Sequence, residues 1–121
     1  MLNELPGEDL ELRRLRTLYR ALGDALRLRI LSLLAELGPV AVNELSNRVQ
    51  VSQPLISWHL RILRVAGFIE TERHGREVIC RLRPAAFAEL HAAETQLLSG
   101  RRAPATAATR APREEGVADV G

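Results

Sequence analysis

The sequence contains little cysteine and few aromatic residues, and both shortages narrow its class. Cys80 is the only cysteine among the 121 residues, which rules out an intrachain disulfide and a metal site built from a cysteine pair. Only 3% of the residues are aromatic although 46% are hydrophobic, so the core must consist mostly of leucine, isoleucine, valine and alanine. This composition favours packed helices over a β-sandwich, in a chain whose length suits one domain.

The sequence also shows no recognisable targeting segment or membrane-spanning segment. The N-terminal residues do not show the charged segment followed by an apolar one that is typical of a signal peptide. No apolar run approaches the roughly 18 residues that a membrane-spanning helix needs. We therefore expect a cytoplasmic protein with no membrane partner.

Lysine is absent, and all 17 basic residues are arginine. Arginine suits bidentate contacts to phosphate and guanine, although GC-rich coding produces the same bias, and we favour that simpler explanation. Because 15 acidic residues oppose them, the formal charge is only +2. The overall charge is therefore weak evidence for a nucleic-acid partner.

Hydrophobic periodicity predicts a mainly helical domain (α+β) with a small β-hairpin. The segment 25–37 has leucine and isoleucine on nearly all sides, so we expect it to form the buried centre of the domain. Gly23 and Gly38-Pro39 mark helix ends, and Ser52 is a favourable N-cap for the helix that follows it. The predicted elements, in order, are helices at 8–22 and 25–37, a short edge strand at 40–42, helices at 43–49 and 52–65, strands at 68–73 and 77–82, and a helix at 84–98.

Beyond residue 98 the hydrophobic period disappears, and alanine, proline, threonine, glycine and charged residues replace it. Such a segment cannot bury enough apolar surface to fold. We therefore predict one domain at 1–98 and a disordered, solvated tail at 99–121. Weak non-specific contact between DNA and the arginines of the tail is the alternative.

The helix that begins after Ser52 has two faces of different chemistry. In a helix with about 3.6 residues per turn, Ile56, Leu60 and Leu63 share one side, which we expect to pack on the 25–37 helix. Residues on the other side suit DNA, because glutamine pairs with adenine, arginine with guanine, and serine with a base edge or a phosphate. Free N–H groups near Ser52 could also bind a phosphate oxygen. The predicted DNA-contacting residues here are Ser52, Gln53, Pro54, Ser57, Trp58, His59 and Arg61.

Two ring-bearing side chains on this helix have competing interpretations. An exposed Trp58 could contact a thymine methyl group or a sugar–phosphate edge, whereas a packed one would fold against Leu55 or Ile62. His59 lies between the two faces, where it would either bond a backbone carbonyl as a partly buried residue or contact a phosphate. A metal role for His59 is disfavoured because no second ligand lies one turn away.

The two strand-like segments form a hairpin with a basic tip. Gly75 supplies the positive φ that a tight turn needs, and Arg73, His74 and Arg76 surround it. An arginine on such a tip can enter a narrow minor groove, which we favour over an ordinary solvated hairpin because a groove-reading helix precedes it directly. Helix and hairpin together predict a winged helix-turn-helix that binds double-stranded DNA.

The first and last helices carry more leucine than a domain of roughly 90 residues can easily bury. We therefore expect these two helices to form a homodimer interface. Two-fold symmetry would then set two recognition helices about one DNA turn apart, matched to an inverted-repeat operator.

Several stretches in unbroken order resemble the ArsR/SmtB family of winged-helix repressors. They are LGDALRLRILSLL at 22–34, SQPLISWHL at 52–60, LRVAGFI at 63–69, and Gly75-Arg76 in the wing. The resemblance covers about residues 15–98. It implies a homodimer with the N- and C-terminal helices at its interface, an operator near the protein's own promoter, and an effector that alters DNA affinity. Metal ions are the best-known effectors of the family.

The sequence departs from the metal-sensing patterns of that family. The cysteine pair of its arsenic and cadmium sensors would fall in 43–47, where this chain has no cysteine. Of the zinc and nickel pattern only the second half is present, as His91 and Glu94. These residues share a helix face, and two such pairs across a dimer interface could bind nickel or zinc. The simpler interpretation is an exposed polar pair.

Three alternatives remain open from the sequence. Cys80 is most simply a small buried hydrophobic residue, with a redox switch as the other possibility. The domain could be a winged-helix protein-interaction module that never binds DNA, for which an exposed Trp58 would be suitable. The effector could be a metal, a small molecule, a partner protein or nothing. An enzyme is the weakest candidate, because we find no nucleophile with a base, no glycine-rich phosphate loop and no carboxylate pair.

Overall fold

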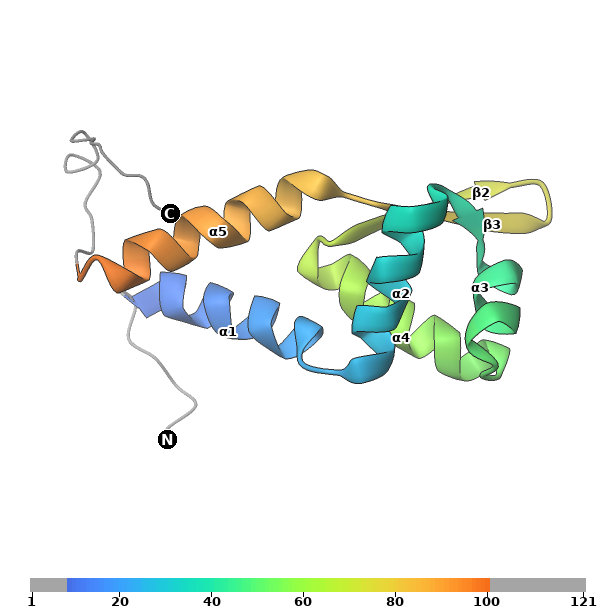
Figure 1. Ribbon diagram of the computed structural model, residues 1–121, viewed down its shortest axis with the longest axis horizontal. Coiled ribbons are helices and arrows are strands. Elements are labelled where there is room, and N and C mark those ends of the chain that lie inside the picture. Colours follow the sequence, from blue (N-terminus) through green and yellow to red (C-terminus); the bar gives the residue numbers. More distant parts are fainter. Residues whose placement is uncertain (1–8, 101–121) are drawn as a thin grey trace.

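Five helices and a small three-stranded sheet make up the computed structural model, which describes residues 9–100 (Figure 1). The predicted order of elements and the mainly α class with a β-hairpin wing are confirmed, and element ends lie within two residues of the predicted ones. Most of the predicted tail, from residue 101, lies outside the described residues. The elements are α1 (Leu10–Leu22), α2 (Ala25–Leu37), β1 (Val40–Ala41), α3 (Val42–Val49), α4 (Gln53–Ala66), β2 (Ile69–His74), β3 (Glu77–Leu82) and α5 (Pro84–Leu98).

Capping interactions within the chain set where α2 and α4 begin. The Asp24 carboxylate accepts a hydrogen bond from the backbone N–H of Arg27 at 3.0 Å, and Ser52 Oγ accepts one from the backbone N–H of Leu55 at 3.4 Å. Each bond satisfies an N–H group that has no partner within its helix. Pro54 lies in the first turn of α4, where its missing N–H costs nothing. The starts of α2 and α4 are therefore determined by neighbouring residues.

Residues in the left-handed backbone conformation lie in the connections before and after α4. Gln50, between α3 and α4, has φ 56°, and its N–H donates to the Ser46 carbonyl. Gly67 ends α4 with φ 90°, a conformation that costs glycine little. These two residues therefore set the directions in which the chain enters and leaves α4.

The sheet pairs β3 with both other strands, in the antiparallel order β1-β3-β2. Val40 pairs with Cys80, and the β2–β3 hairpin stays paired out to His74 and Glu77. The two residues between them form the tip, where Gly75 has φ 66°, as expected for a tight two-residue turn. The hairpin therefore projects as a wing beyond the helices (Figure 1).

The prediction that α2 is buried on nearly all sides is only partly correct. Ile30, Leu31 and Leu34 are in the core, but Leu28 is 50% exposed. Instead, the buried set of α2 includes Arg27. α2 packs against α1, α3, α4 and β3, and these neighbours leave one side of the helix open to solvent. Elsewhere the ring of the partly buried Phe87 packs on the core residue Phe68, with 4.8 Å between the ring centroids.

Helices α1 and α5 pack against each other at one end of the molecule (Figure 1). Tyr19 Oη donates a hydrogen bond to Glu94 Oε2 at 2.8 Å, which ties the two helices together. Leu10, Leu97 and Leu98 near their free ends remain exposed. Within residues 9–100, no helix combines the length and apolar character needed to cross a membrane.

Cys80 is fully buried on the central strand β3. Burial raises the pKa of its thiol to about 12, so the nucleophilic thiolate is almost absent near neutral pH. The interpretation of Cys80 as a small buried hydrophobic residue is confirmed, and its burial disfavours a redox switch.

We expect Cys80 in the folded protein to react with a thiol-specific disulfide reagent at pH 8 at least about 100-fold more slowly than in urea. The reason is that the thiolate fraction falls about tenfold for each unit of pKa above the pH. The absorbance of the released thiolate measures the rate, and the same reaction in urea is the control. Rapid reaction without denaturant would contradict this assignment.

Candidate nucleic-acid interface

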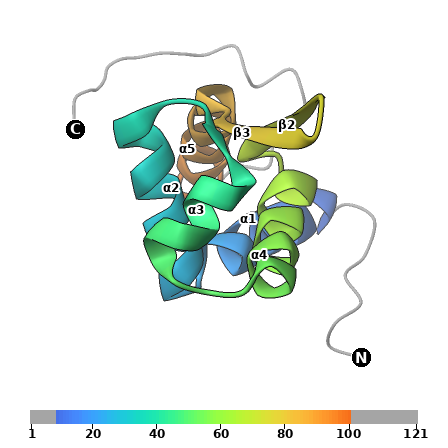
Figure 2. The ribbon, with the colours of Figure 1, turned by 90° about the vertical axis from the view of Figure 1, so that its right-hand side faces the viewer.

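One face of α4 is turned to solvent at the end of the molecule that also carries α3 and the wing (Figure 1, Figure 2). The predicted inward stripe is confirmed, since Ile56, Leu60 and Leu63 are all buried in the core. The predicted outward stripe is exposed as expected, and it comprises Gln53, Pro54, Ser57, Trp58 and Arg61. α4 therefore presents amide, hydroxyl and guanidinium groups on the side away from the core.

Trp58 is 55% exposed, which favours the interpretation in which its indole is presented to a partner. Leu55, one turn earlier, is also exposed, at 42%. An indole and an isobutyl group on the surface offer apolar contact area beside the polar stripe. That area would suit a thymine methyl group and would equally suit a protein.

A groove of about 290 Å³ separates α4 from the wing. Residues 53, 57, 60 and 64 of α4 form one wall, because spacings of three and four residues keep side chains on one helix face. The wing and the first turn of α3 form the remaining walls. The polar residues that line it are Asn43, Gln53, Ser57, Arg64, Thr71, Arg76 and the acidic Glu77.

Besides Glu77, three of these polar groove residues were not among the predicted DNA contacts. They are Asn43 on α3, Arg64 on α4 and Thr71 on β2. Arg64 shares a helix face with Gln53 and Ser57, a spacing that is visible in the sequence. The spacing indicates a groove residue only once the wing is known to lie beside this face of α4. No spacing or motif in the sequence marks Asn43 or Thr71 as groove residues.

The charges near the groove are distributed so that the wing tip stays basic. Arg81 pairs with Glu72 at 2.8 Å and with Glu70 at 3.8 Å along the strands. His74 lies 3.5 Å from Glu72. The arginines that form no ion pair with any residue in 9–100, and that flank the groove or the tip, are Arg61, Arg64, Arg73 and Arg76. These guanidinium groups are free to contact phosphate or bases.

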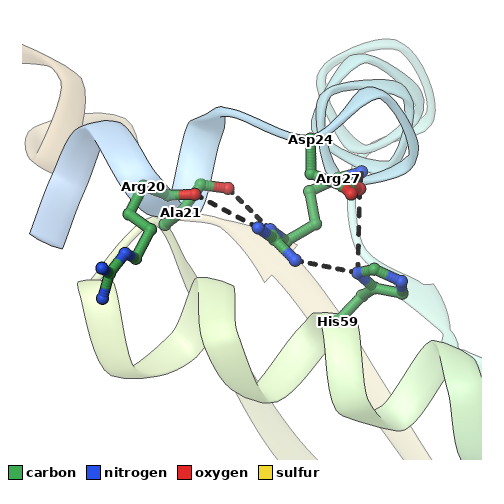
Figure 3. Close-up of polar contacts among 5 residues, drawn as sticks. All are labelled: Arg20, Ala21, Asp24, Arg27 and His59. Atoms are coloured by element: carbon green, nitrogen blue, oxygen red, sulfur yellow. Dashed lines mark hydrogen bonds and ion pairs between the residues drawn. The ribbon is translucent and has the colours of Figure 1, made fainter.

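His59 has a different partner from the predicted backbone carbonyl. Its Nδ1 lies 3.0 Å from a terminal guanidinium nitrogen of Arg27 on α2 (Figure 3). Because guanidinium only donates, this contact makes Nδ1 an acceptor and leaves the ring proton on Nε2. The side chain of His59 is only 12% exposed, which weighs against the predicted phosphate contact.

Arg27 also binds the end of α1, so that one buried side chain joins three helices. Its Nε donates to the Ala21 carbonyl at 2.7 Å, and a terminal nitrogen donates to the Arg20 carbonyl at 3.1 Å (Figure 3). The hydrogen bond from the backbone N–H of Arg27 is the main cause that holds the pKa of the Asp24 carboxyl below its ordinary value. Burial opposes this effect, and the nearby positive charge of Arg27 lowers the pKa by a smaller amount. Asp24 Oδ2 lies 3.8 Å from His59 Nδ1. We call Asp24, Arg27, His59 and the two carbonyls the Arg27 cluster.

The predicted metal pair is present on α5, but one chain does not complete a metal site. His91 Nδ1 lies 3.8 Å from Glu94 Oε1, and His91 is largely exposed. The other carboxylate oxygen of Glu94 accepts the hydrogen bond from Tyr19, a bond that raises the pKa of the tyrosine. Among residues 9–100, no three histidine, cysteine, aspartate or glutamate side chains are grouped to hold a metal ion.

Comparison with known proteins places this arrangement in a family. Residues 24–71 match the family model described as bacterial regulatory protein, arsR family. The transcriptional repressor SmtB of Mycobacterium tuberculosis is 46% identical over 65 residues, a match covering 54% of this chain and 47% of the repressor. The match therefore spans only about half of that relative. The biofilm growth-associated repressor of Xylella fastidiosa is 34% identical over 85 residues, covering 69% of this chain and 74% of the repressor.

A solved structure supports the fold independently. The solution structure of a homodimeric winged helix-turn-helix DNA-binding domain from Mycobacterium bovis, a possible ArsR-family regulator, superposes with a TM-score of 0.63. It is 21% identical and covers 80% of this chain and 90% of that domain. The fold is thus a winged helix-turn-helix, and the matched relatives are transcriptional regulators, not enzymes. The predicted resemblance is confirmed: this chain belongs to the arsR family of bacterial regulatory proteins.

Proposed function

We propose that this protein is a cytoplasmic transcriptional repressor that binds an inverted-repeat operator as a homodimer. In each subunit α4 enters the major groove, and the wing contacts the flanking backbone or minor groove. Gln53, Ser57 and Arg61 read bases, while Arg73 and Arg76 contact phosphates. The effector that regulates binding is a separate question, since one chain supplies only His91 and Glu94 as candidate metal ligands.

The observation that carries this proposal is the exposed polar face of α4 beside a basic wing. Four arginines at this surface form no ion pair with residues 9–100. An arginine with no carboxylate partner keeps its full positive potential, which attracts the polyanionic DNA backbone. Glutamine and arginine side chains on the same face supply base-specific donors and acceptors.

Two further observations support the homodimer. The related Mycobacterium bovis domain is homodimeric, and exposed leucines lie near the free ends of α1 and α5. The paired helices are at the opposite end of the molecule from the wing (Figure 1). A two-fold axis at that end would leave both copies of α4 open to one DNA duplex.

A winged-helix module that binds only protein is the competing function, and the exposed side chains of Trp58 and Leu55 favour it. The salt dependence of the binding affinity distinguishes the two hypotheses. Binding to phosphates releases counterions, so DNA affinity falls steeply as salt concentration rises, whereas an apolar protein interface depends little on salt.

The test is selection of bound duplexes from a random DNA library, followed by titration of the enriched site at several salt concentrations. We expect an enriched inverted repeat whose Kd rises at least about 1,000-fold between 50 and 200 mM salt, as for six or more phosphate contacts. A scrambled duplex of the same length is the control. Failure to enrich any sequence would exclude a sequence-specific repressor.

A further inference from the structure

The amide side chain of Gln53 is bonded to a residue of the preceding helix. Gln53 Nε2 donates a hydrogen bond to Asn43 Oδ1. Asn43 lies in the first turn of α3 and Gln53 in the first turn of α4, and both line the groove beside the wing. The bond therefore connects the two helices at the proposed DNA surface.

This bond is not needed to cap either helix. The N-cap of α3 is Ala41, which makes no side-chain capping bond. The N-cap of α4 is Ser52, whose own hydroxyl accepts the capping bond. Since Asn43 and Gln53 are also both exposed, their mutual bond contributes little to the core. Its consequence is to restrict the orientation of the Gln53 amide.

Orientation matters because glutamine can read adenine only with the correct amide edge. Adenine in the major groove presents an N7 acceptor beside an N6 donor, so the amide must donate from Nε2 and accept at Oε1 together. Nε2 carries two hydrogens. The bond to Asn43 uses one of them, so Nε2 keeps a second hydrogen to donate while Oε1 can still accept. An amide without this bond would rotate among several orientations and lose conformational entropy on binding.

We propose that Asn43 is a positioning residue that fixes the Gln53 amide for recognition of adenine in the operator. This inference rests on the proposed DNA-binding function. Asn43 itself contacts no base in this scheme. It acts by holding Nε2, so its loss should affect sequence discrimination at the base pair read by Gln53 and at no other.

The experiment measures discrimination in binding to the selected site and to variants of that site substituted at each A·T pair. Gln53→Ala identifies the pair that Gln53 reads, where we expect discrimination to fall about tenfold. Asn43→Ala should reduce discrimination at the same pair by about fivefold or more. The double variant should behave as Gln53→Ala alone, because the two residues act as one unit.

A conservative variant separates positioning from a direct phosphate contact. Asn43→Asp keeps an acceptor oxygen for Nε2, so it should restore discrimination while its added negative charge weakens binding to all sequences about equally. Asn43→Ala should leave the salt slope unchanged, whereas loss of a phosphate contact would lower it. Asn47→Ala, at an exposed position one turn further along α3, is the matched control and should change neither quantity.

The possible outcomes distinguish this inference from the proposed function. If the wild-type protein enriches a site but Asn43→Ala discriminates as well as the wild type, the positioning role is wrong and the repressor hypothesis stands. Equal loss of discrimination in Asn43→Asp and Asn43→Ala would also overturn it, because an acceptor at this position would then be insufficient. If the wild type enriches no sequence, both proposals fail. Thermal unfolding of each variant, expected within about 4 °C of the wild type, verifies that the fold is intact.

Discussion

Replacing Arg27 with methionine is expected to lower the free energy of unfolding by about 3 kcal/mol. The Arg27 side chain donates to the carbonyls of Arg20 and Ala21 and to the ring of His59. Methionine is also long and flexible and retains most of the apolar packing, but it donates no hydrogen bond. The Arg20 carbonyl keeps the backbone N–H of Gly23 as a donor, but the Ala21 carbonyl and His59 Nδ1 lose theirs. Each buried acceptor left without a donor costs about 1–3 kcal/mol. The loss should be large because three helices share this one side chain.

Urea unfolding followed by far-ultraviolet circular dichroism measures this effect, at one fixed protomer concentration because dimerisation would contribute to stability. Arg29→Met is the matched control. Arg29 lies on the same helix but is exposed, so its replacement should change stability by no more than about 0.5 kcal/mol. A change of less than about 1 kcal/mol in Arg27→Met would indicate that the Arg27 cluster does not hold α1, α2 and α4 together.

Replacing Arg61 with alanine is expected to weaken operator binding at least about tenfold, equivalent to about 1.4 kcal/mol. Arg61 is exposed on the outward face of α4 and forms no ion pair with another residue in 9–100. Its guanidinium can therefore donate two hydrogen bonds to guanine without breaking an existing contact. Discrimination should relax at one base pair in each half-site.

Arg76→Ala tests a different kind of DNA contact from Arg61→Ala. Arg76 is at the wing tip, where we expect a phosphate or minor-groove contact, so its loss should weaken binding to all sequences similarly. The slope of log affinity against log salt should become shallower by about one for each phosphate contact removed. Fluorescence anisotropy with the selected duplex provides both readouts, and Arg29→Ala serves as the control. Unchanged operator affinity in both Arg61→Ala and Arg76→Ala would overturn this placement of the groove-reading face.

Features that depend on neighbouring residues could be predicted from the sequence. The two faces of α4 follow from the three- and four-residue spacing of Ile56, Leu60 and Leu63, and its start follows from a serine N-cap before Pro54. The wing turn follows from the presence of glycine at position 75, because glycine readily adopts the positive φ that a tight turn needs and that Gly75 shows. Helical period, caps and turns are local properties of the chain, so their prediction needs no knowledge of the packing.

Features that depend on which elements meet could not be predicted in this way. The composition of α2 indicated a helix buried on nearly all sides, yet Leu28 is exposed and Arg27 is buried. Arg27 is stable there because the carbonyls at the end of α1 and the ring of His59 satisfy its donors. Those acceptors come from residues up to 32 positions away in the chain, so the sequence spacing contains no sign of them.

The same distinction between local and tertiary features applies to the proposed DNA-binding surface. Sequence periodicity alone determined the outward stripe of α4, which comprises Gln53, Pro54, Ser57, Trp58 and Arg61, because local backbone geometry decides where each side chain points. Only the tertiary structure placed Asn43 of α3 against Gln53 of α4, and Arg64 and Thr71 on opposite walls of one groove. These pairs exist because the packing of α3, α4 and β2 around β3 and the core brings separate elements to one surface.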